Sequence, residues 1–116
     1  MEIKIVKKPI KLSEVIAIAN AEFGDVIKAV IDIEQKIMAL GGELHADEEV
    51  LLSEREASKR ANTWGINIYP NKSRDIWIEF DSMVNLKPAY GNRSRGVEDK
   101  AIQEKIVHIV DSLIEE

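Results

Sequence analysis

The sequence predicts an α+β fold, with a single sheet of about five mainly antiparallel strands and helices mostly on one face. Five segments alternate apolar and polar residues with period two, as half-buried strands do. Three others repeat apolar residues at helical spacing. Their order is β-α-β-β-α-β-β-α, and the length of 116 residues is that of one domain, residues 1–116.

The first half of the chain contributes three strands and one helix. Residues 2–6 form the first strand and residues 12–23 an amphipathic helix, with Gly24 just beyond its end as a terminator. Residues 26–34 form the clearest strand of this half. Residues 37–40 follow after a short turn, so they are expected to be its antiparallel partner.

The second half contributes the centre of the sheet. Residues 47–60 predict a surface helix, because good helix formers outnumber apolar side chains there. Residues 64–86 contain two alternating segments joined by a turn. Residues 87–96 are rich in Gly, Asn, Ser and Pro, which indicates a loop. Asp99 is expected to cap the last helix, which carries the strongest apolar stripe of the chain.

Alternation in the central hairpin assigns its side chains to two faces. One set is expected to face the core: Ile66, Ile68, Ile78, Phe80 and Val84. The other set is expected on the outer face: Asn67, Tyr69, Trp77, Glu79 and Asp81. With Val30, the two aromatic side chains of the outer face predict a patch that either the second helix or a partner must cover. We therefore expect a homodimer.

Composition limits the classes of protein to consider. The chain has no cysteine, which excludes disulfides and thiolate chemistry. It has neither a signal-peptide pattern nor an apolar run long enough to cross a membrane, so we expect a cytoplasmic protein without membrane contact. The net charge is −5, which argues against nucleic-acid binding. Residues 58–96 nevertheless carry seven bases and three acids, which leaves room for a local basic patch.

Four segments resemble the signature blocks of a small prokaryotic protein family of unknown function. They are Gly41-Gly42-Glu43-Leu44-His45-Ala46-Asp47-Glu48-Glu49, Trp64-Gly65-Ile66-Asn67-Ile68-Tyr69-Pro70, Trp77-Ile78-Glu79-Phe80-Asp81-Ser82 and Asn92-Arg93-Ser94-Arg95-Gly96. The likeness extends over nearly the whole chain. It implies no activity, ligand or catalytic residue.

Catalytic candidates are Glu79, Asp81 and His45. The two acids lie two residues apart on one predicted strand and are expected to point the same way. Paired carboxylates can divide acid and base roles or bind a divalent cation, and His45 could add a nitrogen ligand. The structural alternative is that these acids pair with Arg93, Arg95 and Lys28. Since nothing in the sequence demands a metal or another cofactor, we expect none.

A second candidate is the loop that leads into the last helix. Arg93, Ser94 and Arg95 offer two guanidinium groups and a hydroxyl, which suit a small anionic ligand. Asn67, Tyr69 and Trp77 on the outer face complete the predicted ligand-binding set.

Two functional hypotheses from different classes follow. The favoured one is a non-enzymatic binding or assembly module that uses the open sheet face and the arginine loop. The alternative is a small metal-assisted hydrolase or nuclease acting on a phosphate-bearing substrate through His45, Glu79 and Asp81. The sequence leaves open whether the protein is an enzyme.

Overall fold

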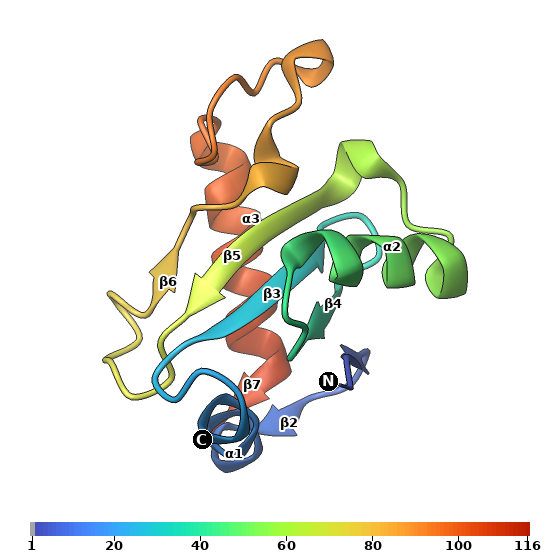
Figure 1. The fold of residues 1–116 in the computed structure, drawn as a ribbon. Coiled ribbons are helices and arrows are strands. Elements are labelled where there is room, and N and C mark those ends of the chain that lie inside the picture. Colours follow the sequence, from blue (N-terminus) through green and yellow to red (C-terminus); the bar gives the residue numbers. More distant parts are fainter. Residues whose placement is uncertain (1) are drawn as a thin grey trace.

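The central element of the computed structural model, which describes residues 2–116, is a five-stranded antiparallel sheet (Figure 1). Its strand order is β1-β4-β3-β5-β6. The strands are β1 (Lys4–Val6), β3 (Ile27–Asp32), β4 (Ile37–Leu40), β5 (Thr63–Ile68) and β6 (Ile78–Glu79). The predicted α+β class is confirmed, and the predicted order of strands and helices is approximately right.

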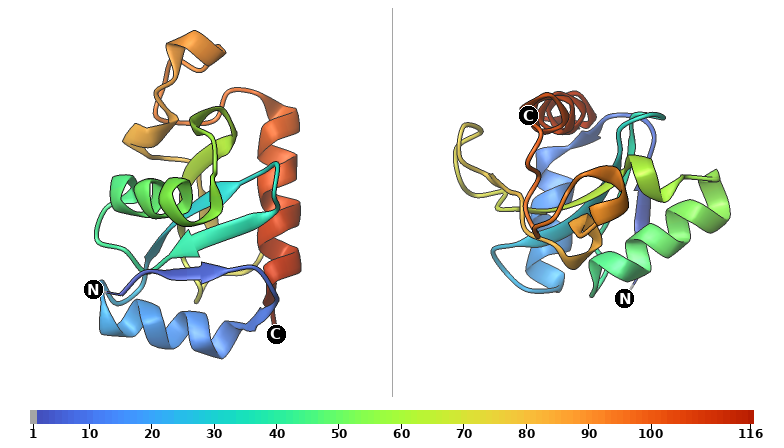
Figure 2. Two further views of the ribbon diagram at one scale, coloured as in Figure 1. Left: turned by 90° about the vertical axis from the view of Figure 1, so that its right-hand side faces the viewer. Right: turned by 90° about the horizontal axis from the view of Figure 1, so that it is seen from above.

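Three helices pack around this sheet: α1 (Leu12–Ala21), α2 (His45–Glu56) and α3 (Lys100–Leu113). Figure 2 shows α3 and α2 on opposite faces, with α1 beside β1. Asp99 caps α3 as predicted, because its Oδ1 accepts a hydrogen bond from the Ala101 N–H at 2.8 Å. No helix within residues 2–116 has the length and apolar composition that a membrane span requires.

Short elements complete the chain. β2 (Ile10–Lys11) pairs in parallel with β7 (Ile114–Glu115), which brings the C-terminus beside the start of α1. Three 3₁₀ turns follow irregular segments: η1 (Arg60–Asn62), η2 (Met83–Asn85) and η3 (Pro88–Tyr90). None of these short elements was predicted, because two or three residues are too few to show a period.

The strands separate the apolar side chains into two cores. Ile27, Ala29 and Ile31 of β3 join the larger core, together with side chains of α1 and α3. Val30 points to the other face and packs in a smaller core with Leu52 of α2. Of the two ways to cover Val30 that the sequence left open, the structure therefore uses the chain's own second helix.

The predicted positions of Trp77 and Val84 were wrong. Trp77 is 1% exposed and belongs to the larger core, where the Arg74 guanidinium lies 4.2 Å from its ring centroid. It precedes the two-residue strand β6, so strand alternation does not fix its side. Val84 lies in η2 and packs in the smaller core beneath α2. Val30 and Trp77 are thus buried within the chain, and of the three side chains that suggested a homodimer only Tyr69 stays on the outer face.

A side-chain amide attaches the segment after β6 to the middle of the sheet. Asn85 Oδ1 accepts from the Gly65 N–H at 2.8 Å, and Asn85 Nδ2 donates to the Gly65 carbonyl at 2.9 Å. The amide thereby satisfies both backbone groups of a β5 residue that lies beyond the reach of the short strand β6. Ser82 and Val84 pack so closely on Gly65 that a Cβ there would lie 2.5 Å from Ser82 Oγ.

Two more buried polar residues hold the following loop. Asn92 Nδ2 donates to the carbonyls of Asn85 at 2.8 Å and Gly96 at 2.8 Å. Lys87 is buried, and its Nζ donates to the Arg60 carbonyl at 2.6 Å. Burial lowers the pKa of Lys87 to about 8, although Glu49 at 3.8 Å partly opposes that shift. The loop is therefore fixed by hydrogen bonds.

Replacing Gly65 with alanine tests this close packing. Because the new methyl group would overlap Ser82 and Val84, we expect Gly65→Ala to lower the free energy of unfolding by about 1–3 kcal/mol. Gly96→Ala is the control, since a Cβ there meets nothing closer than 3.5 Å, and we expect a change within about 0.5 kcal/mol. Urea unfolding measures both, and equal effects would contradict the assignment.

Candidate functional site

A row of polar side chains crosses the face of the sheet that α2 leaves open. Strand pairing places Lys28 of β3 opposite Asn67 of β5, and Asn67 opposite Glu79 of β6. Glu79 Oε1 accepts hydrogen bonds from Asn67 Nδ2 at 2.9 Å and from the Tyr69 hydroxyl at 3.1 Å. The predicted outer positions of Asn67, Tyr69 and Glu79 are thus found, with Glu79 occupied by its neighbours.

Asp81 and Arg95 form an ion pair beside this row. Arg95 Nε donates to Asp81 Oδ1 at 2.7 Å, and the two side chains are 55% and 44% exposed. The two terminal nitrogens of the guanidinium make no hydrogen bond to residues 2–116, so the end of the fork is available to an anion. The predicted structural pairing therefore holds for Arg95 and Asp81. It orients the guanidinium group through Nε and leaves the two terminal nitrogens for a ligand.

The backbone of Arg95 is fixed as firmly as its side chain. Its carbonyl accepts from the Ser82 N–H at 2.9 Å and from Asn85 Nδ2 at 2.9 Å. The amide that binds Gly65 therefore also sets the position of Arg95. Sequence reasoning missed Asn85, although a polar Asn between apolar Val84 and Leu86, just before a Gly-containing and Pro-containing loop, is a weak signal for such a role.

His45 is the first residue of α2 and faces the sheet. Its Nε2 lies 2.8 Å from the Ile66 carbonyl oxygen, which can only accept a hydrogen bond, so Nε2 carries the hydrogen. Burial lowers the pKa of His45 below its ordinary value, although the bond to Ile66 opposes this shift. The ring is therefore neutral at pH 7, and Nδ1 keeps a free lone pair that can accept a hydrogen bond.

A cleft of about 240 Å³ brings these groups together. Cationic Lys28 and Arg95 and neutral His45 line it. Within residues 2–116, Lys28 makes no ion pair, and its Nζ lies 5.3 Å from the centroid of the Phe23 ring. The remaining lining residues are Leu44, Ala46, Ser82, Met83 and Val84. An anion that enters the cleft would meet two cations and no carboxylate among the lining residues.

A larger cleft of about 820 Å³ opens between β1, α1 and α2. Its lysine, Lys4, is paired with Glu14 at 3.3 Å, and three acids, Glu2, Glu14 and Glu22, line it. None of the predicted site residues lies there. The smaller cleft is therefore the better candidate in spite of its size.

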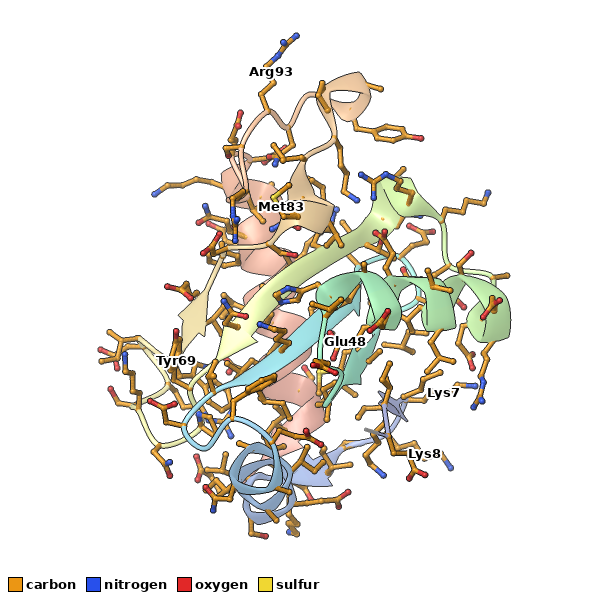
Figure 3. The ribbon with its side chains drawn as sticks, in the orientation of Figure 1. Lys7, Lys8, Glu48, Tyr69, Met83 and Arg93 are labelled. Carbon is orange, nitrogen blue, oxygen red and sulfur yellow. The ribbon has the colours of Figure 1, made fainter. Side chains whose placement is uncertain are left out.

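The rest of the predicted set does not reach the cleft. Figure 3 shows Arg93 extending away from the molecule, and its side chain makes no ion pair with residues 2–116. Ser94 is exposed in the same loop, and Trp77 lies in the larger core. No three His, Cys, Asp or Glu side chains in the described part of the chain lie close enough to hold a metal ion. His45, Glu79 and Asp81 therefore do not meet as a metal centre.

A family model described as "Protein of unknown function (DUF5674)" matches residues 4–113. The chain belongs to this family. Its resemblance to a family of unknown function, based on the four sequence blocks, is thereby confirmed. Comparisons with curated proteins and with solved structures gave no match. For this member of the DUF5674 family, the functional argument therefore rests on its own geometry.

Glu48, in the first turn of α2, is a further ionisable group near the sheet. Glu48 is buried, and its Oε2 accepts from the Gly42 N–H at 2.9 Å (Figure 3). Its Oε1 has no hydrogen-bond partner among residues 2–116. Burial raises the pKa of Glu48 well above its ordinary value, and the bond from Gly42 only partly opposes this effect. An ionised carboxylate at this position therefore lowers the stability of the folded protein.

Glu48→Gln tests this assignment. Folded Glu48 holds its proton to a higher pH than the unfolded chain does, so its stabilising contribution is lost as pH rises from about 4.5 through the raised pKa. We expect the free energy of unfolding of Glu48→Gln, relative to wild type, to increase with pH over that window and then level off.

Urea unfolding of both proteins at several pH values between about 4.5 and 8 measures this difference. Both proteins contain His45, so its titration cancels from the difference. Exposed Glu43, in the same segment, provides the control Glu43→Gln, for which we expect no such increase. A pH-independent difference for Glu48→Gln would overturn the assignment.

Proposed function

We propose that this protein is a non-enzymatic binding module whose cleft holds the anionic group of a small molecule. The single observation that supports this most is the arrangement of Arg95. Asp81 binds its Nε and leaves the forked end free at a cleft that also contains unpaired Lys28. Two cations at one small cleft favour a carboxylate or phosphate, and the guanidinium fork matches either geometry.

The position of the cleft supports the same proposal. It lies where the first turn of α2 meets η2, so the backbone N–H groups at the start of the helix add a positive partial charge. The backbone of Arg95 is fixed, because its carbonyl and the Gly65 N–H both bind the Asn85 amide, and Lys28 belongs to the central strand β3. Preorganised cations lose little conformational entropy when a ligand binds.

We do not propose the metal-assisted hydrolase. Glu79 accepts hydrogen bonds from Asn67 in β5 and from Tyr69 just after it. Asp81 pairs with Arg95, so both carboxylates are already engaged. His45 uses one ring nitrogen on a backbone carbonyl.

Thermal unfolding with and without millimolar phosphate, at constant ionic strength, tests the proposal. We expect phosphate to raise the melting temperature of the wild type saturably, because a ligand that binds only the folded state stabilises it. Arg95→Ala is expected to abolish this rise. Arg95→Ala is expected to lower the free energy of unfolding by no more than about 1 kcal/mol, because the ion pair with Asp81 is half exposed.

Arg93→Ala is the matched control, since Arg93 lies two residues away and points away from the cleft. It is expected to keep the full response to phosphate. If all three proteins respond equally, or if none responds to any anion tried, the proposal fails.

Self-association stays a prediction. Of the three side chains that first suggested a homodimer, Tyr69 alone keeps partial exposure, whereas Val30 and Trp77 are buried. Light scattering at tens of micromolar is expected to give about twice the monomer mass of 13.1 kDa, and Tyr69→Ala is expected to lower it. A wild-type mass of 13.1 kDa at every concentration would contradict the prediction.

A further inference from the structure

The apolar lining of the cleft indicates more about the ligand than its charge. Leu44, Ala46, Met83 and Val84 line it beside the two cations. Leu44 is 57% exposed and Met83 is 60% exposed, and Figure 3 shows Met83 at the surface of η2. Large exposed apolar side chains at a cleft indicate a ligand with an apolar part. A bare inorganic anion would leave both side chains in water.

The hydrogen-bonding groups add a second requirement. His45 Nδ1 is a free acceptor in the neutral ring, since Nε2–H is used on the Ile66 carbonyl. A ligand that offers an N–H donor next to its anionic group would satisfy this acceptor as well as the cations.

The size of the cleft sets a third requirement. At about 240 Å³ it is smaller than the range of about 300–1,000 Å³ typical of pockets for drug-sized ligands. Such a volume suits one amino-acid residue. The cleft is open to solvent at its rim, where Leu44 and Met83 stand, so a chain attached to that residue could leave it.

We propose that the ligand is an aliphatic amino-acid residue with a free α-carboxylate, either a free amino acid or the last residue of a peptide. This inference rests on the proposed anion-binding function of the cleft. The carboxylate binds the fork of Arg95 and the ammonium of Lys28. The α N–H group donates to His45 Nδ1. The aliphatic side chain packs between Leu44, Met83 and Val84 and covers the exposed surface of Leu44 and Met83.

Calorimetric titration of the full chain with four related compounds tests the carboxylate, the amine and the aliphatic side chain of the ligand separately. Leucine is expected to bind. 4-Methylpentanoate has the same carboxylate and chain without the amine, and is expected to bind about tenfold more weakly, which is the value of a net hydrogen bond. Leucinamide lacks the carboxylate and is expected not to bind. Acetate lacks the side chain and is expected to bind at least tenfold more weakly than 4-methylpentanoate.

N-acetyl-leucine separates the two sources of the ligand. If it binds at least as well as leucine, the residue is the C-terminus of a peptide, because acetylation keeps an N–H and mimics the preceding peptide bond. If acetylation abolishes binding while leucine binds, the ligand is a free amino acid. Either result supports the inference.

Two variants link binding to the cleft. Met83→Ala is expected to weaken leucine binding several-fold and leave acetate binding unchanged, because the methionine contacts only the apolar part of the ligand. Ile76→Ala is the control, since Ile76 is 62% exposed and does not line the cleft, and it is expected to change neither.

The outcomes separate the two proposals. If leucine binds no better than acetate, and both depend on Arg95, the amino-acid inference is wrong and the anion-binding function stands. If no anion binds in an Arg95-dependent manner, both are wrong.

Discussion

The hydrogen bonds between the Asn85 amide and Gly65 are the constraint on which the candidate site depends. They satisfy both backbone groups of a central strand where the neighbouring strand has ended, a role that a side chain can fill only if it comes very close. Such an approach requires a glycine on the strand and a small residue, Ser82, above it. The same amide also binds the carbonyl of Arg95. One side chain thus connects the sheet, η2 and the arginine.

Several ionisable groups around this connection are buried at a cost to stability. Burial disfavours the charged form of His45, Glu48 and Lys87. A backbone hydrogen bond offsets part of this effect for His45 and Glu48, and the charge of Glu49 offsets part of it for Lys87. Within residues 2–116, one oxygen of Glu48 has no hydrogen-bond partner. Apolar residues of similar volume would avoid these penalties. Residues that reduce stability in this way concentrate at functional sites, and one of them, His45, lines the cleft.

The acids and the bases of the open face make different contacts. Glu79 and Asp81 are occupied in orienting Asn67, Tyr69 and Arg95, so their charges support neighbouring side chains. The two terminal nitrogens of Arg95 make no hydrogen bond to residues 2–116, and Lys28 has no carboxylate partner among them. A locally positive cleft therefore exists on a chain whose net charge is −5.

The sequence by itself determined the approximate order of the strands and long helices of this protein, together with the helix cap at Asp99, because periodicity and capping are properties of neighbouring residues. It also placed Asn67 and Glu79 on one face, since they belong to paired strands whose side chains alternate. Tyr69, directly after β5, lies on the same face and donates to Glu79. Only the tertiary structure decided that Trp77 joins the core, because one residue outside a strand is not bound by its period. The meeting of Lys28, His45 and Arg95 was equally beyond the sequence. These residues are distant along the chain, and their meeting depends on how α2 crosses the sheet and where the Asn85 amide finds its partners.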